Sequence, residues 1–251
     1  VIVEGGLKGE IIGFDKENSM IMCFDNNVVV RPGTRVLYTE EPVSTYVSED
    51  FLGKVLDPFG NIIYSNNSKI VKTKQKLPLT LDNHSPMERQ KISKIFDCGI
   101  RSINALNTLG IGQRVGIFAG AGVGKTTTLG MIMKHSTIDV VVLALIGERG
   151  REVREYVEDI LGDSFDRAIV IVSTSDQTPI MKVKGAISAL VHAKFLANRG
   201  YNVLLVMDSI TRLAMAQREV GLAVGEPPTL KGYTPSVFLM MSKIIEACGL
   251  I

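Results

Sequence analysis

Apolar runs alternate with helical segments after about residue 95, and this alternation restricts the possible folds more than any other feature. The continuous β-branched or aliphatic runs are residues 115–118, 140–145, 169–173 and 203–207. The segments in which apolar residues recur at helical spacing are 125–135, 151–161 and 179–199. Strands that are buried on both faces of a parallel sheet have such continuous runs. We therefore predict an α/β fold with a mainly parallel sheet, in which ligands bind at the carboxyl ends of the strands.

Residues 1–42 have a different pattern, in which short strand-like segments are separated by Gly, Asn and Pro. This pattern predicts a small antiparallel β-barrel. The chain opens on "VIVEGG" without an initiator methionine, so we expect the barrel to be incomplete. In residues 43–90, "DPFGN" at residues 57–61 predicts a turn between two apolar runs. We interpret this stretch as the beginning of a second domain, residues 43–251.

The composition argues against several classes of protein. With 251 residues and 45% hydrophobic content, the chain can bury a sizeable core. The formal net charge is +2, and the charged residues are spread along the sequence. The sequence therefore lacks the clustered basic residues that indicate binding of duplex nucleic acid. Cys23, Cys98 and Cys248 are widely separated and indicate neither a disulfide framework nor a zinc site, so a reducing cytosol fits best. No apolar run approaches the roughly 18 to 20 residues that span a bilayer.

The segment "GIFAGAGVGKTTTLG", residues 116–130, is typical of a phosphate-binding loop between a strand and a helix. Its glycines allow successive backbone N–H groups to face one concavity, while Lys125 adds a positive charge and Thr126 a hydroxyl for Mg²⁺. Ala119 stands where the strict pattern has glycine, which is tolerated if its φ is negative. The predicted ATP-binding residues are Gly120, Ala121, Gly122, Val123, Gly124, Lys125, Thr126 and Thr127. The alternative is a glycine-rich turn that binds no ligand, but a buried lysine then lacks an anion.

Two acidic residues follow predicted strands. Asp208 comes directly after the run 203–207, where a phosphate-loop protein places the acid that holds Mg²⁺ or one of its waters. The alternative role for Asp208 is the N-cap of the next helix. Glu148, after the run 140–145, is placed to activate the water that attacks a phosphate. Its alternative role is an acidic residue favoured near a helix N-terminus by the helix dipole.

Ordered motifs along nearly the whole chain carry a family resemblance. They include "GIRSINALNTLGIGQRVGIFAG", "VLALIGERGREVREYVED", "VSTSDQTPIMKVKGAISA" and "LLVMDSITRLAMAQREVGLAVGEPPTLKGY". Together with the phosphate loop, these segments resemble the type III export ATPases, most of all their flagellar branch, which are related to the catalytic subunits of F-type and V-type ATPases. In that family the loop begins with alanine as readily as with glycine, so the resemblance implies a working loop.

The resemblance implies a role for each matching residue. Lys125 becomes the phosphate-binding lysine, Glu148 the catalytic glutamate and Arg149 a phosphate-facing or interface arginine. Thr126 becomes the Mg²⁺ ligand and Asp208 an acid of the Mg²⁺ shell. The resemblance also makes Arg212 an arginine that borders the site.

The resemblance further implies a phosphate-loop, RecA-like ATPase core preceded by a partial β-barrel. Members form rings, usually hexamers, that hydrolyse ATP with Mg²⁺ at subunit interfaces to support protein export. Implied partners are stalk and regulator proteins, export substrates and chaperones, with no nucleic acid and only peripheral contact with the inner membrane from the cytoplasm. The family continues past this sequence with an arginine-finger segment and a helical domain, so we expect the chain to be truncated at both ends.

Three alternative functions remain open. A virulence-type secretion ATPase shares these motifs, although "AMAQREVGLAVGEPPTLKGY" favours the flagellar branch. An RNA-translocating termination factor has a similar core, but it requires an RNA-binding domain with exposed aromatic and basic residues, and residues 1–60 lack a basic cluster. The third is an assembly protein that binds nucleotide without hydrolysing it.

Overall fold

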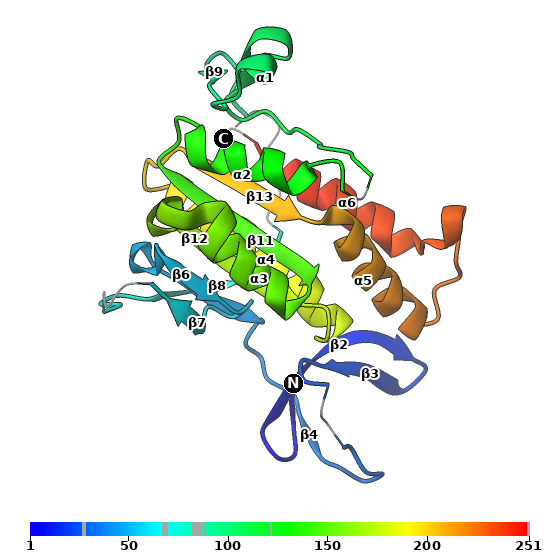
Figure 1. Cartoon of the computed structure of the whole chain (residues 1–251). Helices are drawn as coiled ribbons and strands as arrows, with labels where there is room; N and C mark the ends of the chain where they lie inside the picture. Colours follow the sequence, from blue (N-terminus) through cyan, green and yellow to red (C-terminus); the bar gives the residue numbers. More distant parts are fainter. Residues whose placement is uncertain (27–28, 67–69, 82–86, 88, 121, 250–251) are drawn as a thin grey trace.

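A five-stranded sheet forms the centre of the molecule (Figure 1). The computed structural model describes residues 1–26, 29–66, 70–81, 87, 89–120 and 122–249. In spatial order the strands are β13 (Val203–Asp208), β11 (Val140–Glu148), β12 (Ala168–Thr174), β6 (Lys54–Leu56) and β7 (Ile62–Ser65). Neighbouring strands are parallel except for β7, which is antiparallel to β6. Every residue of β11 is buried, as expected for a strand covered on both faces.

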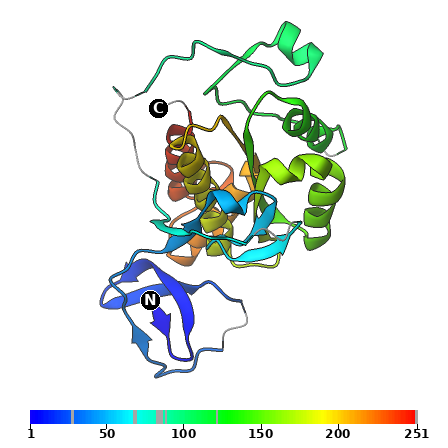
Figure 2. The ribbon, with the colours of Figure 1, turned by 90° about the vertical axis from the view of Figure 1, so that its left-hand side faces the viewer.

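Helices cover both faces of this sheet, and Figure 2 shows the two layers on opposite sides. One layer consists of α4 (Pro179–Ala197), α5 (Ile210–Ala223) and α6 (Pro235–Ala247). The other consists of α2 (Lys125–His135), α3 (Gly150–Glu155), η3 (Tyr156–Leu161) and η4 (Gly162–Arg167). Alternate residues of β11 face the two layers: Val142 and Ala144 pack with the first, Val141 and Leu143 with the second. The predicted α/β fold is confirmed.

The predicted helices agree closely with the structure. α2 has the predicted bounds, and residues 151–161 lie in α3 and η3, the latter a π-helical segment. α4 begins where predicted because Thr178 is its N-cap, accepting a hydrogen bond from the Met181 amide at 3.4 Å. It ends at Ala197 rather than Arg199, since the chain then turns into Gly200, where φ is +91°.

The predicted strand at residues 115–118 is wrong. This segment is irregular, and the side chains of Val115 and Phe118 are 53% and 96% exposed. A β-branched run favours a strand only where a neighbouring strand supplies ladder hydrogen bonds and packing. Within the described ranges, β13 pairs with β11 and not with this segment, so the run lacks the partner that a strand requires.

A four-stranded antiparallel sheet precedes the core, as predicted, with the order β3-β2-β1-β4. Its strands are β1 (Ile2–Val3), β2 (Leu7–Asp15), β3 (Asn18–Cys23) and β4 (Val36–Leu37). An ion pair of 2.7 Å between Glu10 and Lys184 joins β2 to α4. The Thr178 hydroxyl also donates to the carbonyl oxygen of Phe24 at 3.2 Å. The small sheet is therefore fixed against the N-terminal half of α4.

Short elements complete the described chain. The paired strands are β5 (Ser44–Val47) with β8 (Gln75–Pro78), and β9 (Ile95–Phe96) with β10 (Leu109–Gly110). The short helices are η1 (Glu49–Phe51), α1 (Arg101–Leu106) and η5 (Leu230–Gly232). The turn predicted from "DPFGN" is present, since the Asp57 carboxylate accepts the backbone N–H groups of Phe59 and Asn61 at 2.8 Å each.

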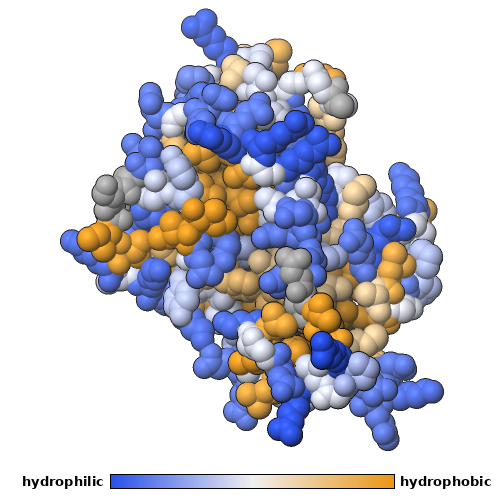
Figure 3. Space-filling view, turned by 60° about the horizontal axis from the view of Figure 1, so that its bottom comes forward, coloured by the Kyte–Doolittle hydropathy of each residue, from blue (hydrophilic) through white to orange (hydrophobic). Residues whose placement is uncertain are grey.

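Apolar side chains remain exposed on the N-terminal sheet and on the edge strand β7. Phe14 and Leu37 are 72% and 64% exposed, and Ile62 and Ile63 are 42% and 59% exposed. Figure 3 shows hydrophobic areas separated by hydrophilic side chains on the face that carries the N-terminal sheet. No described helix combines the length and the apolar character that crossing a membrane would need.

Candidate nucleotide-binding site

A hollow of about 370 Å³ lies where the carboxyl ends of β11 and β13 meet the first turn of α2. This is the position at which open α/β sheets bind their ligands. The lining residues are Lys125, Thr126, Glu148, Glu152, Glu155, Tyr156, Ile160, Asp208 and Arg212. The fold thus brings four of the predicted site residues, Lys125, Thr126, Glu148 and Asp208, into one hollow from three separate segments.

The loop before α2 contains two glycines in the left-handed backbone region, as phosphate-binding loops do. Gly122 and Gly124 have φ angles of +74° and +97°, a region that residues with a Cβ atom rarely adopt. Gly124 is also the N-cap of α2, so the loop and the free amides of the first helical turn adjoin one another. Among the described non-glycine residues, positive φ occurs at Lys16 and Lys231, so Ala119 does not need the freedom of glycine.

Not every predicted loop residue lines the hollow. Gly120, Val123 and Thr127 are exposed beside it, and Val123 is 72% exposed. Ala121 lies outside the described residues. Lys125 and Thr126, which are predicted to bind phosphate and Mg²⁺, do line the hollow.

Asp208 is a buried carboxylate with a partner on each oxygen. Its side chain is 3% exposed, and Lys125 Nζ, 83 residues away in sequence, donates to Oδ1. The Tyr156 hydroxyl donates to Oδ2. A carboxylate in this position is stable only when its charge is paired and hydrogen-bonded. Asp208 is not the N-cap of α5, because Ser209 takes that position and accepts the Arg212 amide at 3.4 Å.

Glu148, the last residue of β11, has an unusual environment for a carboxyl group. Its side chain is 8% exposed, and Arg212 Nη2 lies 3.1 Å from Oε2. Burial, with a hydrogen bond to Glu152, raises the pKa of Glu148 to about 7, although the Arg212 charge opposes the shift. The same hydrogen bond lowers the pKa of Glu152. A carboxyl group with a pKa near the working pH is suited to accept and release a proton.

Arg149 does not line the hollow. It is exposed at the N-cap of α3, directly after the buried Glu148. Its predicted role, toward phosphate or toward a neighbouring subunit, stays a prediction. Arg212 does line the hollow, because its guanidinium binds both the Gly147 carbonyl oxygen and Glu148.

The sequence-based reasoning did not identify Glu152, Glu155, Tyr156 and Ile160 as lining residues. A signal for two of them was present, since Glu148, Glu152 and Tyr156 are spaced four residues apart. Residues at that spacing lie on one face of a helix, so a helix that follows Glu148 directs both side chains back toward the site.

The residues present fit a nucleotide with Mg²⁺. Across the described chain, no group of three or more His, Cys, Asp or Glu side chains is placed to hold a metal ion. Thr126 and Asp208 instead offer two oxygen-bearing side chains beside the phosphate nest. Mg²⁺ in phosphate sites is typically bound by one or two protein oxygens, with phosphate oxygens and waters as the remaining ligands.

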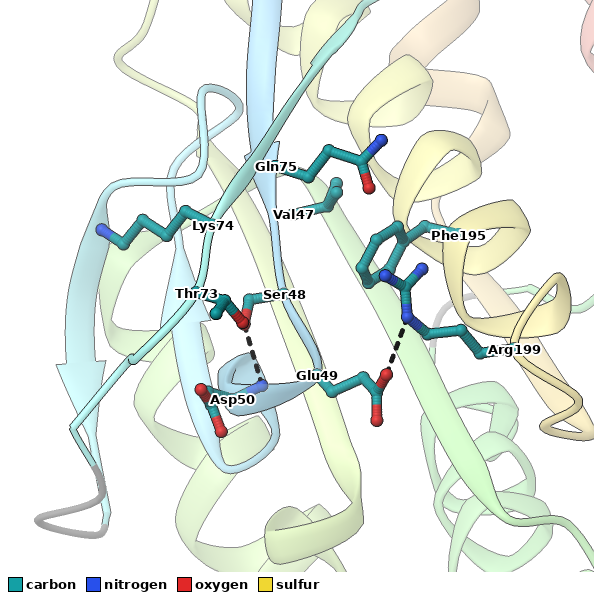
Figure 4. Close-up of a pocket in the computed structure, with 9 residues that line it drawn as sticks. All are labelled: Val47, Ser48, Glu49, Asp50, Thr73, Lys74, Gln75, Phe195 and Arg199. Carbon is teal, nitrogen blue, oxygen red and sulfur yellow. Dashed lines mark hydrogen bonds and ion pairs between the residues drawn. The ribbon is translucent and has the colours of Figure 1, made fainter.

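A second hollow, of about 510 Å³, lies at the other end of the sheet (Figure 4). It is bordered by η1, by the irregular segment that leads into β8 and by the C-terminal end of α4 with the residues that follow it. Glu49 and Arg199 form an ion pair of 2.7 Å there, and the Arg199 guanidinium carbon lies 3.7 Å from the centre of the Phe195 ring. This hollow is at the amino ends of the parallel strands, opposite to the predicted site.

The fold and the site together define a nucleotide-binding domain of the phosphate-loop class. A family model described as "ATP synthase alpha/beta family, nucleotide-binding domain" matches residues 99–251, and the chain belongs to this family. The flagellum-specific ATP synthase of Aquifex aeolicus is 55% identical over 244 residues, which are 97% of this chain and 54% of that protein. The type 3 secretion system ATPase of Xanthomonas euvesicatoria is 41% identical over 244 residues, 97% of this chain and 55% of that protein.

A solved structure supports the same relationship. The assembled ATPase EscN from the enteropathogenic E. coli type III secretion system superposes with a TM-score of 0.89 and 38% sequence identity, covering 98% of this chain and 60% of that one. The chain spans about half the length of the curated relatives it matches.

Proposed function

We propose that this chain is the nucleotide-binding part of an ATPase that hydrolyses ATP with Mg²⁺. One observation carries the proposal: a lysine after a glycine nest, a buried aspartate and a buried glutamate with a pKa of about 7 surround one hollow. A protein that only bound nucleotide would not need a buried carboxyl group tuned to exchange protons near neutral pH. This feature favours catalysis over the non-catalytic alternative.

Each residue then has a defined task. The amides around Gly122 and Gly124, with the ammonium group of Lys125, bind the β- and γ-phosphates. The Thr126 hydroxyl and the Asp208 carboxylate would hold Mg²⁺ or its waters, and the ion would neutralise charge on the phosphates when bound. Glu148 accepts a proton from the attacking water, while Arg212 fixes the orientation of the Glu148 carboxylate.

We further propose that the protein works as a homo-oligomeric ring, a hexamer, that supports flagellar protein export. The support is similarity: the relatives include flagellum-specific enzymes of Aquifex aeolicus and Bacillus subtilis, at 55% and 45% identity. The type 3 secretion relative, at 41% identity, makes non-flagellar export the second candidate. The exposed apolar residues of β7 and of the N-terminal sheet are compatible with subunit contacts.

Expected partners follow from the same similarity. One similar structure, at a TM-score of 0.88, is of the assembled ATPase EscN in complex with its central stalk EscO, so we propose a stalk protein as a partner here. Regulator proteins, export substrates and chaperones are further proposed partners, on the cytoplasmic side of the inner membrane. We also propose that residues 1–42 form a separate domain, since β1 to β4 pair only with one another among the described strands.

Phosphate release separates a catalyst from a nucleotide-binding scaffold. In a version extended to the length of the relatives, we expect Glu148→Gln to lower turnover by a factor on the order of 10² to 10⁴ with little change in ATP affinity. Glu158→Gln is the matched control, because it alters another glutamate that pairs with an arginine, Arg154, but lies outside the hollow. Nucleotide binding without phosphate release by the unmodified protein would instead support the scaffold.

A further inference from the structure

Tyr156 is a buried residue of the hollow for which the proposed chemistry has no task. The residue begins η3, and 4% of its surface is exposed. Its ring packs in the same core cluster as Leu145 of β11 and Val206 of β13. A phenylalanine ring would fill this space equally well, so the hydroxyl group needs its own explanation. Buried tyrosine hydroxyls are normally retained because they have a hydrogen-bond partner.

The partners of this hydroxyl are the two residues predicted to hold Mg²⁺. It donates to Asp208 Oδ2, 52 residues away in sequence, while Lys125 occupies Oδ1. Burial, followed by this hydrogen bond, raises the pKa of Tyr156 far above its usual range, and a hydrogen bond with the Thr126 side chain opposes the shift. One neutral hydroxyl thus contacts both a residue of α2 and the end of β13.

We propose that Tyr156 is a positioning residue that fixes the Asp208 carboxylate and the Thr126 hydroxyl for binding of Mg²⁺ with the nucleotide. This inference rests on the proposed function. By holding Oδ2, Tyr156 prevents rotation of the carboxylate and leaves Oδ1 directed at Lys125 and the phosphate loop. Once Lys125 engages a phosphate, the Oδ1 atom that it releases would be available to the ion or its waters. Groups that orient metal-binding side chains in this way typically contribute 10- to 100-fold to metal affinity or activity.

The test compares nucleotide binding with and without the metal. A fluorescent N-methylanthraniloyl derivative of ATP is titrated onto the 251-residue chain in excess Mg²⁺ and in EDTA. We expect Tyr156→Phe to weaken binding in Mg²⁺ by roughly 10- to 100-fold and to change binding in EDTA by less than about twofold. Tyr201→Phe is the matched control, since it removes another tyrosine–carboxylate hydrogen bond, the 3.1 Å contact with Glu49 at the other end of the sheet.

A double-mutant cycle tests whether Tyr156 acts through Asp208. In an Asp208→Asn background, Tyr156→Phe should have little further effect on binding in Mg²⁺, because the group that it positions has already been altered. Circular dichroism spectra of all variants check that each one is folded.

The binding measurements distinguish failure of this inference from failure of the proposed function. An equal loss of affinity in Mg²⁺ and in EDTA would show that Tyr156 only packs the core, and unchanged affinity in Mg²⁺ would show that its hydroxyl positions nothing. Either result overturns the inference but leaves the proposed function intact. Absence of nucleotide binding by the unmodified chain would instead contradict the proposed function itself.

Discussion

The two hollows of this protein lie at opposite ends of the same sheet and differ in how far their charged side chains are exposed to solvent. At the amino ends of the strands, Glu49 and Arg199 pair with 45% and 39% of their side chains exposed (Figure 4). At the carboxyl ends, the side chains of Glu148 and Asp208 are 8% and 3% exposed. An exposed pair contributes at most about 1 kcal/mol to stability, whereas burying a carboxylate is costly unless partners or a ligand compensate. The burial of charge, rather than the larger volume, therefore marks the functional end.

The backbone explains why the two ends differ. At the carboxyl ends, β11 and β13 lead directly into helices, and the glycine loop opens α2 beside them. Helix N-termini and glycine nests present free N–H groups, which attract anions. At the amino ends, the last turn of α4 presents carbonyl groups instead, and the cation of Arg199, which follows α4, pairs with Glu49. Phosphate binding is thus expected only at the carboxyl ends.

Removing one lysine from each hollow is expected to give the largest difference between the two ends of the sheet. We expect Lys125→Ala to abolish the thermal stabilisation by Mg-ATP, which at a hundredfold excess over Kd is worth about 2.7 kcal/mol. Lys74→Ala, in the hollow at the amino ends, should leave that stabilisation unchanged, since Lys74 lies near the Tyr46 and Phe51 rings. Differential scanning fluorimetry of both variants measures the effect. A normal shift in Lys125→Ala would contradict the assignment of the phosphate loop.

The pH dependence of hydrolysis tests whether Glu148, at the carboxyl ends of the strands, is buried in the working protein. Because burial raises the pKa of Glu148 to about 7, its carboxyl group is protonated below that pH and cannot accept a proton from water. In the version extended to the length of the relatives, kcat/KM should therefore fall about tenfold for each pH unit below 7. The residual activity of Glu148→Gln should lack this dependence. A break near pH 4.5, the ordinary value for glutamate, would mean that Glu148 is solvated in the working protein.

Much of the fold follows from local patterns in the sequence. The helix at Lys125–His135 and the buried strands β11, β12 and β13 depend on spacing and on continuous apolar runs, which short segments already contain. The run at residues 115–118, Val-Gly-Ile-Phe, is also apolar but forms no strand. Strand formation depends on a neighbour in space, and composition does not specify that neighbour.

The candidate site was predictable to the extent that it consists of motifs. Lys125, Thr126, Glu148 and Asp208 belong to local patterns, and the structure brings them around one hollow. The contact between Tyr156 and Asp208 joins segments 52 residues apart and depends on how η3 packs against β13. The pKa shift of Glu148 also arises from tertiary burial. Long-range packing of this kind has no signature in a single sequence.

Amide hydrogen exchange, followed with and without Mg-ATP on the 251-residue chain, tests the central claim that the nucleotide binds at the carboxyl ends. The account predicts slower exchange at residues 122–126 and 148–156, which contain the loop, Glu148 and Tyr156. It predicts no change at residues 47–51 and 72–75, which border the hollow at the amino ends. Protection of the second pair of segments, with the first pair unchanged, would contradict the claim.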